Sequence, residues 1–263
     1  MAIVDARDLL HHAAASGYRL PAARIAGMEE ALEVLEAAER TGCPIALSIS
    51  EARFALPVDI AMPAIEVAAE RASVPVVLRW EEVASQTVLA RAIKLGCSAL
   101  VLPTQQTPAE GLEVLAERCG AIAVRPDAPG FVDLDSSRAR PQLEALLTAM
   151  AAAWQAPVAL QQVRRWRAVE HVVMFNAPDL SDANVQVMFE LGAQKLGAIP
   201  GVRSVRFGRA ARPDSRYGLC WFVRFASAAV VESYKNHPMH VDFADNHFRP
   251  FASDRLTSDF LTF

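Results

Sequence analysis

One local pattern recurs through the first 162 residues: an amphipathic helix, a short connector, and a brief apolar run. Three copies are ALEVLEAAERTG with CPIALSIS, IEVAAERAS with VPVVLRW, and TVLARAIKLG with CSALVLP. Two more are LEVLAERCG with AIAVRPD, and LEALLTAMAAAWQ with APVALQQ. The runs are apolar at both odd and even positions, which is typical of parallel strands buried on both faces. With a first strand at 21–26, the pattern predicts about six parallel strands in an α/β sheet or a (β/α) barrel.

The pattern changes around residues 163–168, VRRWRA. After it, EHVVMFN, VRSVRFGRA, YGLCWFVRFA and DRLTSDFLTF have the composition of strands. SDANVQVMFELGAQKLGAI, with Ser181 as its N-cap, and SAAVVESYKN have that of helices. The order is βαββαβ, a ferredoxin-like arrangement. We therefore expect two domains, at residues 1–163 and 168–263.

Composition and motifs exclude several classes of protein. The 263 residues have a formal net charge of −4, which gives no overall electrostatic basis for binding nucleic acid. We expect no membrane partner, because no apolar run approaches the roughly 20 residues that span a bilayer. A GxGxxG or GxxxxGK[ST] motif follows none of the expected strands, and we expect no cofactor. The N-terminus lacks the pattern of a secretion signal, and the four cysteines lack CxxC spacing, so we expect a reduced, cytoplasmic location: Cys43, Cys97, Cys119 and Cys220.

The second domain resembles a known family. HVVMF, IPGVRSVRFGR, FASAAVVESYKNHPMHVDF and the closing SDF are similar to the Dabb family, the stress-responsive dimeric A/B barrel domains. The resemblance implies a ferredoxin-like fold whose sheet pairs with that of a second protomer. The expected first and third strands are also apolar at alternate positions on both faces, so a partner should cover the face without helices. Both arguments predict a homodimer through this domain.

Histidines in this domain are the main candidates for chemistry. Pro238 suits the first position of a helix, which makes His237 a capping residue and places His240 in the first turn, where the helix dipole favours neutral imidazole. Resemblance to the plant polyketide cyclases of the Dabb family implies that His171 and His240 line a ligand cavity, with Tyr234 beside them. Such a set could deprotonate an activated carbon and polarise a carbonyl. The candidate apolar lining is Val173, Phe175, Trp221 and Phe243.

Three alternatives stay open for this domain. His171 and His240 could instead be structural, and the first helix lacks the tyrosine of the cyclases. A zinc site at His237 and His240 with Asp242 or His247 is the weakest alternative, and we expect no metal. A group of arginines could attract an anionic ligand or simply protect an exposed sheet edge: Arg203, Arg206, Arg209, Arg212 and Arg216.

The first domain resembles class II, zinc-dependent fructose-bisphosphate aldolases. The similar segments are ARDLLHHAAASGY, EEALEVLEAAERTGCPIALSISE, VPVVLRWEE and ARAIKLGCSALVLP, and they imply a (β/α) barrel. Glu81 stands at the family's catalytic aspartate, and histidines of the family are replaced by Arg79, Glu82 and Gln161. At about 160 residues, the domain is shorter than the 200 or more of a complete barrel. We therefore expect a truncated barrel without aldolase activity.

The remaining groups of this domain offer no substitute for the zinc site. His11 and His12 lie on the first expected helix, and Lys94 lies at a helix end, where it cannot form a Schiff base inside a barrel. Glu81 and Glu82 end a strand, the place where barrels perform chemistry, but we expect both at a solvated rim.

Two hypotheses for function follow. The first is a small-molecule-binding Dabb protein, with cyclase- or lyase-like chemistry on an apolar carbonyl compound and an inactive aldolase-like domain. The second is a non-catalytic, stress- or pathway-associated dimeric module for binding or assembly.

Overall fold

The computed structural model describes residues 3–104, 110–126, 130–135, 140–151 and 163–261. The chain divides into two compact units, residues 1–166 and 167–263, except that Arg118–Gly120 group with the second unit. The units are described separately below. Among the described residues, no helix is both long enough and apolar enough to cross a membrane.

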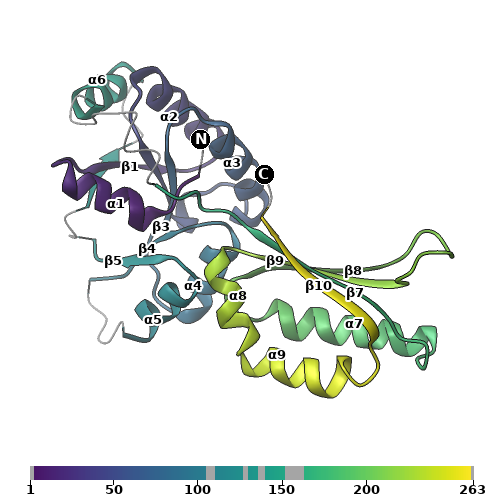
Figure 1. Cartoon of the computed structure of the whole chain (residues 1–263). Coiled ribbons are helices and arrows are strands. Elements are labelled where there is room, and N and C mark those ends of the chain that lie inside the picture. The colour runs from purple at the N-terminus through teal and green to yellow at the C-terminus, as the bar shows by residue number, and fades with distance from the viewer. Residues whose placement is uncertain (1–2, 105–109, 127–129, 136–139, 152–162, 262–263) are drawn as a thin grey trace. The chain divides into compact units, whose positions relative to one another are not determined.

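The N-terminal domain is built on a sheet of six parallel strands, shown in Figure 1. The strand order is β5-β4-β3-β2-β1-β6, so the last strand lies beside the first, as it would in a barrel. Within the described residues no strand joins β5 to β6, and the sheet is a parallel half-barrel. The strands are β1 (Leu20–Ile25), β2 (Ile45–Ile49), β3 (Val76–Trp80), β4 (Ala99–Val101), β5 (Ile122–Val124) and β6 (Phe131–Asp135).

The helices of this domain alternate with the strands. Asp5 caps the first helix by accepting a hydrogen bond from the backbone N–H of Arg7, and Ser85 caps the fourth in the same way. The second helix ends at Gly42, whose φ of 66° a glycine adopts without strain. The helices are α1 (Ala6–Ala15), α2 (Met28–Thr41), α3 (Val58–Arg71), α4 (Gln86–Lys94), α5 (Glu110–Arg118) and α6 (Arg140–Ala151).

The expectation of buried parallel strands is confirmed, but the sixth strand of the structure is a different segment from the one predicted. The first five predicted strands correspond to β1–β5, and every residue of β2 and β3 is buried. The sixth predicted strand, APVALQQ, lies outside the described residues. The sixth strand of the structure is instead β6, which the sequence pattern did not predict, because FVDLD contains two aspartates and is flanked by Gly and Pro.

The inner face of the half-barrel changes from apolar to charged along the strands. Ala22, Ala46 and Val77 belong to one core cluster with Leu9 and Ala13 of α1. Two residues further along each strand, on the same face, Arg24 is paired in register with Ser48, and Ser48 with Arg79. This polar row therefore lies toward the carboxyl ends of the strands.

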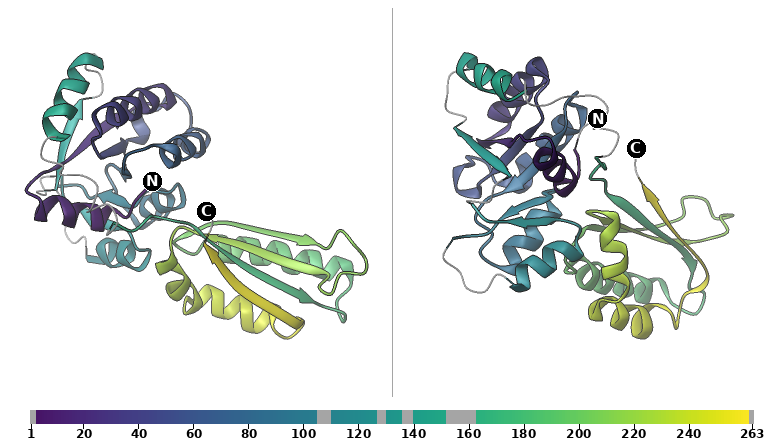
Figure 2. Two further views of the ribbon diagram at one scale, coloured as in Figure 1. Left: turned by 45° about the horizontal axis from the view of Figure 1, so that its top comes forward. Right: turned by 60° about the vertical axis from the view of Figure 1, so that its left-hand side comes forward.

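The C-terminal domain has the predicted βαββαβ order and an antiparallel sheet in the order β10-β7-β9-β8. Figure 2 shows its helices on one face of the sheet. The strands are β7 (Val169–Asn176), β8 (Val202–Arg209), β9 (Leu219–Phe225) and β10 (Ser253–Leu261). The helices are α7 (Asp182–Gly197), α8 (Ala228–Lys235) and α9 (Pro238–Phe243), and a π-helical turn covers Ala244–Phe248.

An aromatic core fills the space between this sheet and its helices. Trp221 of β9 lies with its ring centroid 4.8 Å from that of Phe189 and 5.7 Å from that of Phe243. Gly192 of α7 is required there, because a Cβ atom would lie 2.5 Å from both Trp221 and Phe243. The face of the sheet without helices is less buried: Phe222 retains 36% exposure.

Candidate functional site

His171 lies on β7 and points toward the helices with a carboxylate beside it. β10 pairs with β7 so that Asp259 is directly opposite His171, and Asp259 Oδ1 is 2.7 Å from His171 Nδ1. A carboxylate only accepts, so Nδ1 carries the proton and donates it to this bond. In the neutral ring, Nε2 is then left as an acceptor. The side chain of His171 is 15% exposed.

Tyr234 lies on α8 between the two histidines. Its ring centroid is 6.0 Å from that of His171 and 4.4 Å from that of His240. Phe225 contacts the same ring, with 4.7 Å between centroids. Tyr234 is 3% exposed, and this burial raises the pKa of its hydroxyl, which therefore stays protonated and able to donate.

His240 is held at the start of α9. His237 caps this helix as predicted, because its Nδ1 accepts a hydrogen bond from the backbone N–H of Met239, and Pro238 occupies the first position. His240 Nδ1 lies 3.0 Å from the carbonyl oxygen of Lys235. A carbonyl only accepts, so Nδ1 donates and Nε2 is the free acceptor.

The environment favours the neutral form of His240. Burial is the largest cause that lowers its pKa, and the nearby charge of Arg249 acts in the same direction, against the hydrogen bond to Lys235. The sequence predicted a neutral ring from the helix dipole, whereas in the structure the main cause is desolvation of the ring by burial. An imidazole with a lowered pKa and a free Nε2 is a suitable proton acceptor near pH 7.

The structure thus brings together the three residues proposed for chemistry: His171, Tyr234 and His240. It adds two neighbours that sequence reasoning missed, Asp259 and Phe225. Asp259 could have been found only from the register between the first and last strands of the domain, which places it opposite His171. No local sequence motif indicates this pairing.

The four residues proposed as an apolar lining are placed differently. Val173 is 8% exposed, Phe175 0%, and both Trp221 and Phe243 2%. Phe175 packs edge-on against Phe248 with 4.9 Å between centroids, and the other aromatics pack around Gly192. These side chains form the core described above, and their contact with a ligand stays a prediction.

A second group of charges lies in the N-terminal domain, near the carboxyl end of β3 and in the middle of β6. Arg79 is 2% exposed, and its Nη1 lies 2.5 Å from Asp133 Oδ1. Its Nη2 lies 3.3 Å from Glu81 Oε1, and its guanidinium carbon is 4.7 Å from the centroid of Phe131. Arg24 Nη2 is 3.4 Å from the other oxygen of Asp133.

This group corrects one expectation. Glu81 is not part of a solvated rim: its side chain is only 10% exposed and is paired with Arg79. A carboxylate this deeply placed requires a positive partner, and Arg79 supplies it. Glu82 is exposed as expected, with an unusual φ of 56°.

The residues present do not fit the zinc ion of class II aldolases. Arg79 stands at a position where the resembling family has a histidine, and a guanidinium is permanently charged and has no lone pair to donate to a metal. Gln161, the other replacement noted in the sequence, lies outside the described residues. Across the part of the chain that the structure describes, no group of three or more His, Cys, Asp or Glu side chains is arranged to hold a metal ion.

Other predicted residues have ordinary structural roles. His12 Nδ1 lies 2.9 Å from the hydroxyl of Tyr18, and Lys94 is the last residue of α4. Three of the arginines proposed to attract an anion are already paired with aspartates, at 2.9, 2.8 and 3.2 Å: Arg209–Asp182, Arg212–Asp214 and Arg216–Asp254.

Comparison with known proteins identifies a family for each domain. Residues 169–262 match the model of the Stress responsive A/B Barrel Domain (Dabb), and residues 4–110 match that of Fructose-bisphosphate aldolase class-II. Fructose-bisphosphate aldolase from Pseudomonas aeruginosa is 31% identical over 107 residues, which are 39% of this chain and 29% of that protein. The chain therefore spans less than a third of the length of this curated relative.

Two solved structures are similar to the C-terminal domain. A Dabb family protein with a ferredoxin-like fold from Mesorhizobium loti is 24% identical, covers 37% of this chain and 98% of its own, and gives a TM-score of 0.35. Hydroxynitrile lyase from Passiflora edulis is 16% identical, covers 37% of this chain and 94% of its own, and gives a TM-score of 0.34. Together, the family models and the two sheet topologies identify a class II aldolase-like half-barrel domain followed by a Dabb domain.

Proposed function

We propose that the Dabb domain binds a small apolar compound with a carbonyl group and transforms it by acid–base chemistry without a cofactor. The observation that carries the proposal is the position of Tyr234, whose ring lies 6.0 Å from His171 and 4.4 Å from His240. A protonated hydroxyl between two imidazoles supplies both a hydrogen-bond donor and a proton acceptor.

Each side chain has a distinct task in this proposal. Nε2 of His240 removes a proton from the carbon next to the carbonyl; the electron pair of the broken C–H bond forms a C=C bond, and the π pair of the carbonyl moves onto its oxygen. The hydroxyl of Tyr234 donates a hydrogen bond to that oxygen as its negative charge develops. Asp259 fixes the ring of His171 with Nε2 available to the ligand.

For the N-terminal domain we propose a scaffold role without aldolase chemistry. Arg79 occupies the inner face near the carboxyl ends of the strands, where a (β/α) barrel normally holds its reacting groups. Its contacts with Asp133 and Glu81 at 2.5 and 3.3 Å leave that position filled by a paired cation.

A second candidate is a non-catalytic module for binding and assembly. The packing around Gly192, where not even a methyl group fits between Trp221 and Phe243, favours this reading, because it leaves that part of the interior filled by protein. The two candidates differ in whether a ligand contacts His240.

Native mass spectrometry with a metabolite extract tests the proposal. The wild-type protein should retain a small molecule, which the His240→Ala variant should lose. His237→Ser is the matched control, because serine preserves the cap of α9 and should preserve retention. Retention of nothing by the wild type, or equal retention by all three proteins, would favour the non-catalytic module.

A further inference from the structure

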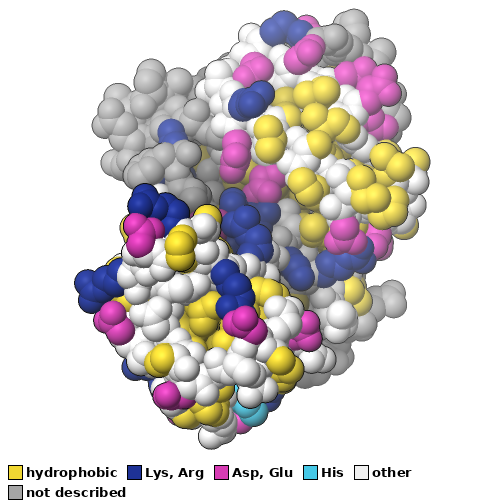
Figure 3. All heavy atoms as spheres, turned by 90° about the vertical axis from the view of Figure 1, so that its right-hand side faces the viewer, with side chains coloured by type: hydrophobic (Ala, Val, Ile, Leu, Met, Phe, Trp, Pro, Cys, Tyr) yellow, Lys and Arg dark blue, Asp and Glu magenta, His cyan; other side chains and the backbone are white. Residues whose placement is uncertain are grey.

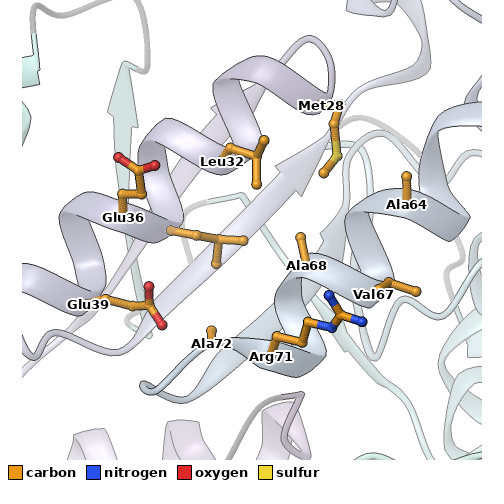
Figure 4. Close-up of a pocket in the computed structure, with 10 residues that line it drawn as sticks. Met28, Leu32, Glu36, Glu39, Ala64, Val67, Ala68, Arg71 and Ala72 are labelled. Carbon is orange, nitrogen blue, oxygen red and sulfur yellow. The ribbon is translucent and has the colours of Figure 1, made fainter.

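An apolar groove runs between α2 and α3 on the N-terminal domain. It has a cavity of about 530 Å³ with mainly apolar walls. Figure 4 shows side chains from both helices bordering the space between them, with Glu36 and Glu39 on the α2 side. The lining residues are Met28, Leu32, Leu35, Glu36, Glu39, Ala64, Val67, Ala68, Arg71 and Ala72.

The groove is elongated. A second cavity of about 400 Å³ shares Met28 and Ala64 with the first and extends past Ile60 to Leu56. On α3, the lining positions 60, 64, 67 or 68, and 71 recur every three or four residues, which is one face of a helix. Because α3 has 14 residues, this face is about 21 Å long. That length matches about four turns of a helix laid along it.

Several apolar side chains that line the groove are largely exposed to solvent. Leu32 is 43% exposed, Val67 47%, Leu56 61% and Ile60 65%. Figure 3 shows hydrophobic side chains gathered on one face of the molecule, with acidic and basic side chains around them. Exposed apolar patches with a polar rim are typical of interaction sites.

The charged side chains beside the groove indicate which kind of partner it can bind. The side chains that line the two cavities include four carboxylates and one guanidinium group: Glu29, Glu30, Glu36, Glu39 and Arg71. A second copy of the chain, docked groove to groove, would bring one set of carboxylates against the other, which opposes self-association. A partner with Lys and Arg beside an apolar face would complement both the charge and the apolar walls.

We propose that this groove binds an amphipathic α-helix of a partner protein, with apolar residues in the groove and basic residues beside the acidic rim. Recognition of this kind places apolar side chains at positions i, i+3, i+4 and i+7 into a groove. The basic flanks accelerate association and select the partner against acidic helices. The proposal concerns the N-terminal domain alone and does not depend on the histidine site.

Fluorescence anisotropy with the full-length protein tests this proposal. The probe is a fluorescein-labelled amphipathic peptide of roughly 16 residues, with a leucine stripe and lysine flanks. Its control has glutamate in place of every lysine. The basic peptide should bind at least about tenfold more tightly than the acidic one, and the difference should shrink at high salt.

Variants of the protein locate the binding site. Ala68→Trp fills the groove and should weaken binding of the basic peptide about tenfold, whereas Ala14→Trp, at an exposed position of α1, should leave it unchanged. Glu36→Lys should weaken binding of the basic peptide and strengthen that of the acidic one. Circular dichroism verifies that each variant is folded.

Three outcomes would overturn the proposal. The first is equal affinity for the basic and acidic peptides, and the second is equal affinity of the Ala68→Trp and Ala14→Trp proteins. The third is loss of self-association in Ala68→Trp with unchanged peptide binding, which would assign the groove to a second copy of the chain.

Discussion

Arg79 Nη1 and Asp133 Oδ1 lie 2.5 Å apart, although their strands, β3 and β6, are separated in the sheet by β1 and β2. The contact therefore reaches across the inner face of the half-barrel. The guanidinium also contacts Glu81 and the ring of Phe131. A single buried cation thus joins the two sides of the curved sheet.

Removal of this cation should destabilise the N-terminal domain. Arg79→Met leaves the carboxylate of Glu81, 10% exposed, without its positive partner, and we expect a loss of about 3–5 kcal/mol in the free energy of unfolding. Urea unfolding followed by circular dichroism measures it. Arg53→Met, at an exposed position, is the control and should change stability by less than about 0.5 kcal/mol. Equal stability of the two variants would show that the ion pair contributes little.

The protein should contain no stoichiometric zinc and should not cleave fructose 1,6-bisphosphate. The physical reason is that Arg79 places a paired, permanent positive charge where the resembling family has a histidine. Metal analysis of protein purified without chelators, and a coupled aldolase assay, measure the two properties. About one zinc per chain, lost on Glu82→Ala, would contradict this prediction.

The stability of the Dabb domain should fall at mildly acidic pH through His240. Its pKa in the folded protein is lowered from 6.5, so the unfolded chain binds the proton more readily. The contribution of His240 is fully present above pH 6.5 and is lost as the pH falls from there through the lowered pKa. NMR titration of the ring protons measures the pKa directly. A midpoint at or above 6.5 would contradict the expectation, and the His240→Gln protein should lack this part of the pH dependence.

Gly192→Ala should destabilise the Dabb domain, because the new Cβ would lie 2.5 Å from Trp221 and Phe243. We expect a loss of about 1–3 kcal/mol from overpacking. Gly197→Ala in the same helix is the matched control, since its Cβ would meet only Val205 at 3.9 Å. Thermal unfolding compares the two, and a Gly192→Ala protein as stable as the control would show that the aromatic cluster shifts easily.

The protein should be a homodimer through the face of the Dabb sheet that lacks helices. Leu256, Phe260 and Phe222 lie on that face with exposures of 46%, 54% and 36%. Burial of such a face between identical protomers is a common arrangement. Light scattering should give twice the chain mass of 28.5 kDa for the wild type and the mass of one chain for Phe222→Asp. Val187→Asp, at a 63% exposed position on α7, should remain dimeric. A wild-type mass near 28.5 kDa would exclude the dimer.

The sequence predicted those features that depend on local patterns. Apolar runs identified β1–β5, and the His–Pro pair identified the start of α9 and the capping role of His237. Features that depend on residues far apart in the chain were missed. Asp133 gives β6 a polar sequence, and its partner Arg79 lies 54 positions earlier in the chain, so no local pattern reveals that the charge is paired. Asp259 gains its role only from the register that sets it opposite His171.

The position of β6 beside β1 also determines when the sheet of the N-terminal domain can be completed during synthesis. Arg79 leaves the ribosome 54 residues before Asp133, and Arg24 leaves it 109 residues before. At about 5–20 residues per second, roughly 3–11 s pass before the carboxylate that pairs with Arg79 has been synthesised. Until then β1 lacks the strand that pairs with its outer edge, and of the two carboxylates that pair with Arg79 only Glu81 has been made. The sheet of the half-barrel therefore becomes complete only late in the synthesis of the N-terminal domain, when the five residues of β6 have been made.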